Sequence, residues 1–144
     1  PRSASAAATT FDAASLIGIR TRMDDAASPF TGPWARRIGV RTLEAGTGAV
    51  ELDRSDYVRN SFGTINGGVH GMVFQAAAEG AHPGFVATDL HVHYLAQAKS
   101  GPARTSAALV RDSGDHRVVE VSMVDAGHDD LLMSTGSVSL ARPR

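Results

Sequence analysis

The segment from Gly67 to Gly80 constrains the fold of this chain more than any other, because its apolar side chains point in nearly every direction around a helix. One side of this helix consists of Val69, Met72, Val73, Ala76 and Gly80, and the other of Phe74, Ala78 and Ala81. A helix that is apolar nearly all round is a buried helix. Its length of about 20 Å is close to that of a six-residue strand. The sequence therefore predicts one central helix that strands enclose.

Strand-like runs lie on both sides of this segment. Before it, the alternating run that starts at Arg37 and the run Ala49–Leu52 surround a Gly-containing turn, which is typical of a hairpin. After it, turn sequences separate four longer runs, at Val86–Leu95, Ala103–Arg111, Arg117–Asp125 and Leu131–Leu140. Antiparallel strands around a single helix predict an α+β fold.

The N-terminal part of the chain has weaker patterns. Residues 1–10 are small and polar, and we interpret them as a loose, disordered tail. The apolar residues between Phe11 and Met23 have the spacing of a short amphipathic helix. Asp24–Pro33 is rich in turn residues, and Trp34 at its end is interpreted as an anchor in the core or at an interface. Since no repeat or linker occurs, we expect residues 1–144 to form one domain.

Composition excludes several classes of function. Hydrophobic residues make up 42% and charged residues 20%, the balance of a soluble globular protein. A net charge of -1 gives no electrostatic basis for binding nucleic acid or an anionic membrane. The absence of cysteine excludes disulfides, thiolate metal sites and cysteine nucleophiles. Neither a membrane-spanning run nor a signal peptide is recognisable, so we expect a cytoplasmic protein.

The segment from Asn60 to Val69, NSFGTINGGV, together with the apolar helix after it, resembles hotdog-fold thioesterases related to phenylacetyl-CoA thioesterase. That family typically shows an Asn, a Gly a few residues later, and then His-Gly-Gly at the start of the central helix. Ala87–Leu95 resembles the family's first strand after the helix, and Val124-Asp125 and Leu132–Gly136 resemble its closing strands. The likeness covers the chain from about residue 38 to residue 140.

This resemblance implies a hotdog fold, with an antiparallel sheet of five to six strands wrapped around the central helix. It implies a homodimer or a dimer of dimers, with acyl-CoA sites at the dimer interface. The expected activity is hydrolysis of an acyl-CoA or acyl-carrier thioester with a small aromatic or aliphatic acyl group, without a cofactor. In such enzymes a backbone N–H at the helix start polarises the thioester carbonyl, and an acidic residue two turns along activates water or attacks directly.

Asn60 matches the family's loop Asn, and Gly67 and Gly68 match its glycine pair. The first N–H groups of a helix are unpaired and lie at the positive end of its dipole, so they suit a developing oxyanion. Alternatively, the two glycines only permit a tight turn into the helix. Two positions depart from the family: Asn66 stands in place of the His, and Gln75 in place of the acid.

The Gln at position 75 does not ionise, so it cannot act as a general base or a carboxylate nucleophile, although it can orient a water or donate to the substrate. Otherwise it is a polar residue at the rim of a buried helix. Glu79, the only acidic residue of the helix, shares one narrow arc with Gly71, Gln75 and His82. It could replace the usual acid if the backbone compensates for a shift of one turn, about 5.4 Å. Otherwise Glu79 is paired or solvated.

Asn60 and Asn66 could position substrate or water through their amides, or could simply hold their own turns. Val69 and Thr88 lie in the segments that resemble the family. The candidate catalytic residues are Gln75, Glu79 and Asn60, and the candidate oxyanion or substrate-binding residues are Asn66, Gly67, Gly68, Val69 and Thr88.

Asp89, His91 and His93 alternate onto one strand face, a pattern that can bind a metal. The opposite face, with Val86, Thr88, Leu90, Val92 and Tyr94, is expected to pack on the helix. The histidines then lie on the outer sheet face, where we expect no metal and regard a pH-sensitive assembly face as the better alternative. His70 is expected to face an interface or solvent.

Three functions remain in competition. The first is the thioesterase. The second is a hotdog protein that has lost hydrolysis and binds acyl-CoA or a related small ligand, which Gln75 in place of the acid favours. The third is a dehydratase or hydratase, which is disfavoured because that chemistry usually needs a paired His and acid, and no His stands at the matching position of the helix start.

Overall fold

The structure, a computed structural model, describes residues 33–144. The tail, helix and loop expected within residues 1–32 lie outside the described part of the chain. The elements are α2 (Pro33–Ile38), β1 (Val40–Glu44), β2 (Ala49–Leu52), α3 (Gly67–Ala81), β3 (Val86–Tyr94), β4 (Ala103–Asp112), β5 (His116–Asp125) and β6 (Leu131–Ala141). No helix among residues 33–144 is long and apolar enough to cross a membrane.

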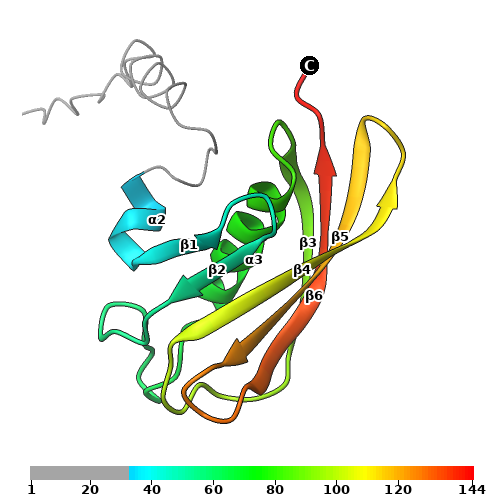
Figure 1. The fold of residues 1–144 in the computed structure, drawn as a ribbon. Helices are drawn as coiled ribbons and strands as arrows, with labels where there is room; N and C mark the ends of the chain where they lie inside the picture. The colour runs from blue at the N-terminus through cyan, green and yellow to red at the C-terminus, as the bar shows by residue number, and fades with distance from the viewer. Residues whose placement is uncertain (1–32) are drawn as a thin grey trace, which may run out of the picture.

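The sheet has six antiparallel strands in the order β1-β2-β4-β5-β6-β3. It curves around α3, and the helix contacts every strand from β2 to β6 (Figure 1). The predicted α+β hotdog fold, with its central helix and its four long strands, is confirmed. Within the described residues β3 pairs with β6 alone, so β3 forms one edge of the sheet.

The core lies between α3 and the sheet. Phe74, at the middle of α3, is fully buried and is the largest such side chain among the described residues. Burial of a side chain of this size stabilises the fold by about 1.5–3 kcal/mol. The other fully buried apolar residues of α3 and of β5 and β6 are Val73, Ala77, Ala78, Val119, Val121, Met123, Met133, Val138 and Leu140. The helix is thus apolar nearly all round because strands of the sheet lie on several sides of it.

The chain enters the sheet later than the alternating pattern predicts. Residues up to Ile38 belong to α2, and Gly39, at φ +81°, follows the helix before β1 starts at Val40. A proline at the first helical position and a glycine just past the last one are the usual boundaries of a short helix. Of the two roles expected for Trp34, the anchor in the core is wrong, because this side chain is 62% exposed and the Arg37 guanidinium lies 5.5 Å from its ring. The anchor at an interface stays a prediction.

A bulge in β3 changes which residues face α3. The register with β6 shifts between Ala87 and Asp89. Beyond the bulge the prediction holds, and Leu90 meets the helix at Gly71. Before it the prediction is wrong, because Ala87, rather than Val86, packs against the core, and Thr88 is exposed and donates to the carbonyl of Ser139 over 3.3 Å.

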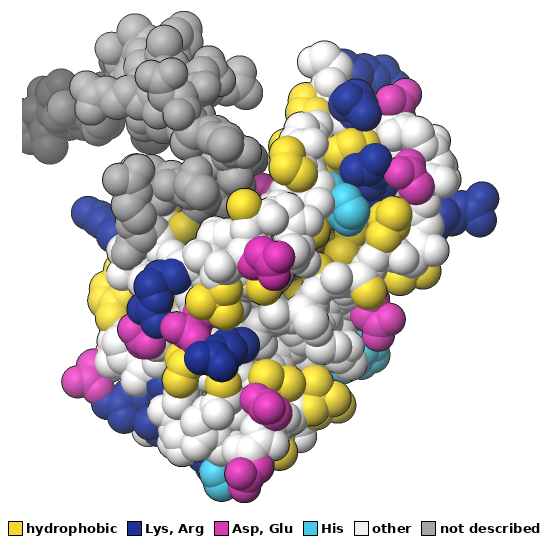
Figure 2. All heavy atoms as spheres, viewed as in Figure 1, with side chains coloured by type: hydrophobic (Ala, Val, Ile, Leu, Met, Phe, Trp, Pro, Cys, Tyr) yellow, Lys and Arg dark blue, Asp and Glu magenta, His cyan; other side chains and the backbone are white. Residues whose placement is uncertain are grey.

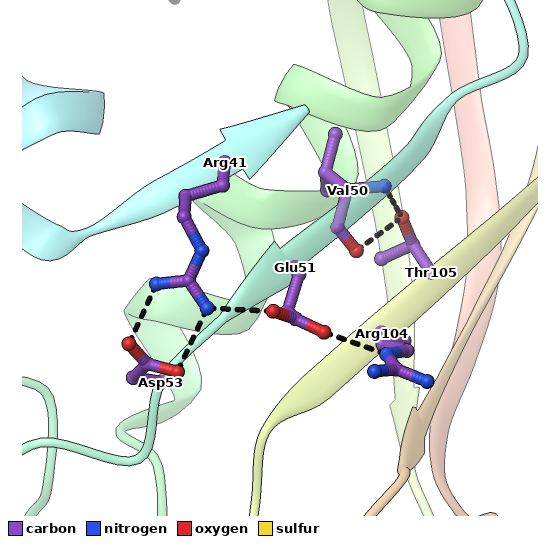
Figure 3. Close-up of polar contacts among 6 residues, drawn as sticks. All are labelled: Arg41, Val50, Glu51, Asp53, Arg104 and Thr105. Atoms are coloured by element: carbon purple, nitrogen blue, oxygen red, sulfur yellow. Dashed lines mark hydrogen bonds and ion pairs between the residues drawn. The ribbon is translucent and has the colours of Figure 1, made fainter. Parts of the chain in front are cut away.

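A polar network joins the first strands to the rest of the sheet (Figure 3). Glu51 accepts from Arg41 and from Arg104, each over 2.6 Å, and Arg41 also donates to Asp53. Hydrogen bonds from Arg41 and Arg104 hold the pKa of Glu51 below its usual value. On the face seen in Figure 2, acidic and basic side chains are interspersed, so no large patch of one charge sign forms there.

The loop between β3 and β4 is held by one buried carboxylate. Asp125 accepts from the backbone N–H groups of Lys99, Ser100 and Gly101 over 2.6, 2.9 and 2.7 Å. Burial opposes ionisation of Asp125, but these N–H groups together lower the pKa of the carboxyl. The loop is therefore fastened to the end of β5.

Candidate active site

The start of α3 is capped by Asn66. Its side-chain oxygen accepts from the Gly68 N–H over 2.9 Å, and its carbonyl accepts from Val69 and His70 over 2.9 and 3.2 Å. Among the described residues, the Gly67 N–H has no such acceptor. Since it lies at the positive end of a 15-residue helix, it is the backbone donor available to an anion there. Sequence reasoning named both glycines, whereas the Gly68 N–H is occupied by the cap.

An open groove of about 470 Å³ lies between α3 and β3. It is lined by Gly67, Gly68, Gly71, Met72, Gln75, Leu90, Val92 and Tyr94. A Cβ at Gly71 would lie 3.1 Å from the Leu90 Cδ2, and one at Gly67 would lie 3.2 Å from the Tyr94 hydroxyl. Glycine at these two positions therefore lets the helix and the strand approach each other closely.

Tyr94 and His70 fix the geometry where the groove meets the helix start. The Tyr94 hydroxyl donates to the Gly67 carbonyl over 2.9 Å. The Tyr94 ring meets the His70 ring edge-on, with centroids 5.4 Å apart, and the His70 Nδ1 lies 2.9 Å from the Ser134 hydroxyl. Burial lowers the pKa of His70 to about 4, so its ring is neutral at pH 7. The expectation that His70 faces solvent is wrong, since the side chain is buried.

Gln75 lines the groove, and Glu79 lies behind it. The Gln75 Nε2 donates to the Glu79 Oε1 over 3.1 Å, and the Ala87 backbone N–H donates to the same oxygen over 2.8 Å. Glu79 is 2% exposed, and its Oε2 is buried without a hydrogen-bond partner among residues 33–144. Burial raises the pKa of Glu79, which the hydrogen bonds from Ala87 and Gln75 partly oppose. Because it is buried, the Glu79 carboxyl group does not line the groove.

The structure brings together only part of the predicted site. Asn60 holds its own turn, because its side chain accepts from Phe62 N–H over 3.0 Å and its own N–H donates to the Thr64 carbonyl. Neither Val69, which packs against the core, nor Thr88 lines the groove. The lining residues that sequence reasoning did not name as site residues are Gly71, Met72, Leu90, Val92 and Tyr94. The sequence predicts that the strand face with Leu90, Val92 and Tyr94 packs on the helix, but not that it meets the helix residues Gly71, Met72 and Gln75.

The two strand histidines lie on the opposite face of the sheet. The rings of His91 and His93 stack with centroids 4.5 Å apart, beside a shallow groove of about 310 Å³ that Glu120 also lines. Among residues 33–144, no group of three or more His, Asp or Glu side chains is placed to hold a metal ion.

Comparisons with solved structures agree with the architecture. The BH2602 protein from Bacillus halodurans, solved with CoA, is 18% identical, with a TM-score of 0.66 over 89% of this chain and 83% of that chain. A variant of the thioesterase SAV0944 from Staphylococcus aureus is 14% identical, with a TM-score of 0.69 over 78% of this chain and 100% of that chain. The PaaI protein from the phenylacetic acid degradation operon of E. coli is 13% identical, with a TM-score of 0.65 over 90% and 94%. At such low identities the likeness shows the fold.

A family comparison goes further than the fold. A search of curated proteins found no match. The model of the acyl-CoA thioesterase N-terminal domain matches residues 58–141, a range that includes α3 and the four long strands. Because this match spans more than half of the sequence, the chain belongs to the family of the acyl-CoA thioesterase N-terminal domain.

Proposed function

We propose that this protein hydrolyses the thioester of an acyl-CoA, or of an acyl carrier, that bears a small aromatic or aliphatic acyl group. One observation carries the proposal: Gly67, whose N–H has no acceptor among the described residues, and Gln75 both line the groove beside α3. The family to which the chain belongs, and the CoA in the BH2602 structure, support a thioester of this kind as the substrate.

In the proposed mechanism the thioester carbonyl oxygen accepts from the Gly67 N–H. Negative charge that develops on this oxygen is stabilised by the donor and by the helix dipole, and one such donor contributes about 3–4 kcal/mol in known enzymes. Gln75 accepts a hydrogen bond from a water and directs its oxygen at the carbonyl carbon. The water oxygen forms a C–O bond to this carbon and the C–S bond breaks. The leaving thiolate takes up the proton that the water loses, so that the products are the acid and the free thiol.

The Gln75 amide cannot take the proton from water, so the reaction is expected to be slow. A missing general base typically lowers a rate by about 10²–10⁴. Burial keeps Glu79 out of the groove lining, so that carboxyl group does not replace the base in the mechanism proposed here. Asn66 contributes by capping the helix, and it does not line the groove.

We propose that the working unit is a homodimer, with two dimers pairing as the larger assembly. Three apolar side chains at or just beyond the edge strand are strongly exposed: Leu90 at 39%, Tyr94 at 59% and Leu95 at 55%. Exposed apolar edge strands are normally covered. A second copy that pairs along β3 would cover them and close the groove. Sedimentation should then give at least twice the chain mass of 15.0 kDa, and a monomer would contradict the proposal.

Thiol release from a panel of aromatic and aliphatic acyl-CoAs tests the hydrolysis. We expect the wild type to turn over at least one of them, and Gln75→Ala to lower kcat by at least about tenfold, because the attacking water loses its orientation. Gln97→Ala is the matched control, since Gln97 is exposed and lies outside the groove. Equal rates for wild type and Gln75→Ala would remove Gln75 from the mechanism.

A catalytically impaired protein that binds acyl-CoA is the second candidate function. The amide at position 75, where the resemblance leads us to expect an acid, favours it. Absence of thiol release across the panel, together with a melting temperature that rises when acyl-CoA is added, would support this function.

A further inference from the structure

We infer that Glu79 is a positioning residue, which sets the orientation of the Gln75 amide so that its carbonyl oxygen, and not its NH₂ group, is presented to the groove. The inference rests on the proposed hydrolysis for its catalytic meaning. The orientation of the amide itself is inferred from the contacts among Gln75, Glu79 and Ala87.

The orientation of a glutamine amide depends on what its two ends contact. The Gln75 NH₂ group donates to the Glu79 Oε1 over 3.1 Å. A carboxyl oxygen with this partner accepts a hydrogen bond, so the NH₂ end of the amide must point to it. The opposite end of the amide is then an acceptor at the groove. A water that donates a hydrogen bond to this acceptor keeps an oxygen lone pair free to point at the carbonyl carbon.

Glu79 is itself held in place. The Ala87 backbone N–H donates to the same Oε1 over 2.8 Å, which ties the carboxyl group to the start of β3. The side chain is 2% exposed and is enclosed by the core, so it has little freedom to turn. The Ala87 backbone therefore holds the Glu79 carboxyl group, and this carboxyl group in turn holds the Gln75 amide at the groove.

The other carboxyl oxygen of Glu79 argues that this arrangement does not serve folding alone. Within the described part of the chain Oε2 is buried without a partner, and an unsatisfied buried polar atom is destabilising. An apolar side chain of similar size would fill the same space without that cost. Since Glu79 also makes no contact with the groove, the one contact through which it can affect a substrate is Gln75.

Kinetics of three variants test the inference. Glu79→Met removes the acceptor and fills the space, and we expect kcat to fall about 10- to 100-fold with KM unchanged. Glu79→Gln keeps a carbonyl oxygen for Gln75 and Ala87, and should restore most of the rate. Adding Gln75→Ala to Glu79→Met should cause little further loss, because both changes remove one interaction. A wild-type kcat in Glu79→Met, or an equal loss in Glu79→Gln, would overturn the inference.

Side-chain amide NMR separates this inference from the proposed function. The chain holds two glutamines and two asparagines, so the ¹⁵N spectrum contains four side-chain amides and Gln75→Ala identifies one of them. In the wild type we expect a downfield, slowly exchanging proton for Gln75, and in Glu79→Met the shifts of a free amide. An unchanged Gln75 signal in Glu79→Met would refute the inference even if the protein releases no thiol. A changed signal without turnover would uphold the orientation and contradict only the hydrolysis.

A melting measurement excludes the trivial explanation of a lower rate. Glu79→Met removes a carboxyl oxygen that has no hydrogen-bond partner among the described residues, but it also leaves the Ala87 N–H without its acceptor. Because these two effects oppose each other, the melting temperature should stay close to that of the wild type. If Glu79→Met unfolds more easily and its Gln75 signal stays in the wild-type position, Glu79 is a structural residue.

Discussion

The Tyr94 hydroxyl donates to the carbonyl oxygen of Gly67 over 2.9 Å, and so joins the last residue of the edge strand to the first residue of the central helix. The same Gly67 carries the N–H that lies at the groove. The position of this donor therefore depends on a residue 27 positions later in the chain.

We expect Tyr94→Phe to lower the free energy of unfolding by about 0.5–1.5 kcal/mol, the usual contribution of one hydrogen bond. It should also lower kcat, because the helix start is less firmly held. Urea unfolding and thiol release measure the two effects. Tyr57→Phe is the matched control, as Tyr57 is the other tyrosine of the chain and is 65% exposed. Equal effects of the two substitutions would show that the Tyr94 hydroxyl has no special role.

Gly71→Ala is expected to narrow the groove, because its Cβ would lie 3.1 Å from the Leu90 Cδ2. KM for the best acyl-CoA should rise severalfold while the fold is kept. Gly80→Ala on the same helix meets no atom within 4 Å, and should stabilise the protein by up to about 1 kcal/mol through helix propensity alone. A KM that rises equally in both variants would show that groove width is not the cause.

Asn66→Ala removes the cap of α3 and should cost about 0.5–2 kcal/mol of stability. Asn66→Ser keeps a capping oxygen and should recover most of that loss. Chemical unfolding of the three proteins checks this order. If Asn66→Ala also raises activity, the Gly68 N–H that it releases contributes a second donor to the substrate.

Because of its lowered pKa, the buried His70 should lower the free energy of unfolding in mild acid. Its pKa in the folded protein is about 4, below its ordinary value of 6.5, so the unfolded chain binds the proton more readily. The stability that His70 contributes is complete above pH 6.5 and is lost as the pH falls toward 4. Melting temperatures at pH 7.5 and 5.0 measure this loss, and His70→Asn should reduce it. His128→Asn changes an exposed histidine and should leave the pH dependence as it is.

The sequence predicts most of the architecture because the patterns involved are local. An apolar helix of 14 residues and four long strands separated by Gly-rich turns are legible without a structure, and all five are present. The helix face with Gly71 and Gln75 and the strand face with Leu90 and Tyr94 are each predicted separately. Their contact forms the groove.

Partners far apart in the sequence could not be predicted. His70 finds Ser134 on β6, 64 positions later. Glu79 lies on the same helical arc as Gln75, but its Oε1 also accepts from the N–H of Ala87, a residue of the strand that follows the helix. The periodicity of a helix gives directions for its side chains, and it contains no information on which of them a later strand will bury.

The bulge in β3 has a consequence for how this site tolerates change. Ala87, at which the register shifts, is also the residue whose N–H holds Glu79. Deleting Thr88 would straighten the strand, and every side chain before the deletion would then exchange sheet faces. Related chains that lack the bulge residue in β3 should therefore also lack a glutamate at the position of Glu79, and the two features should be gained or lost together.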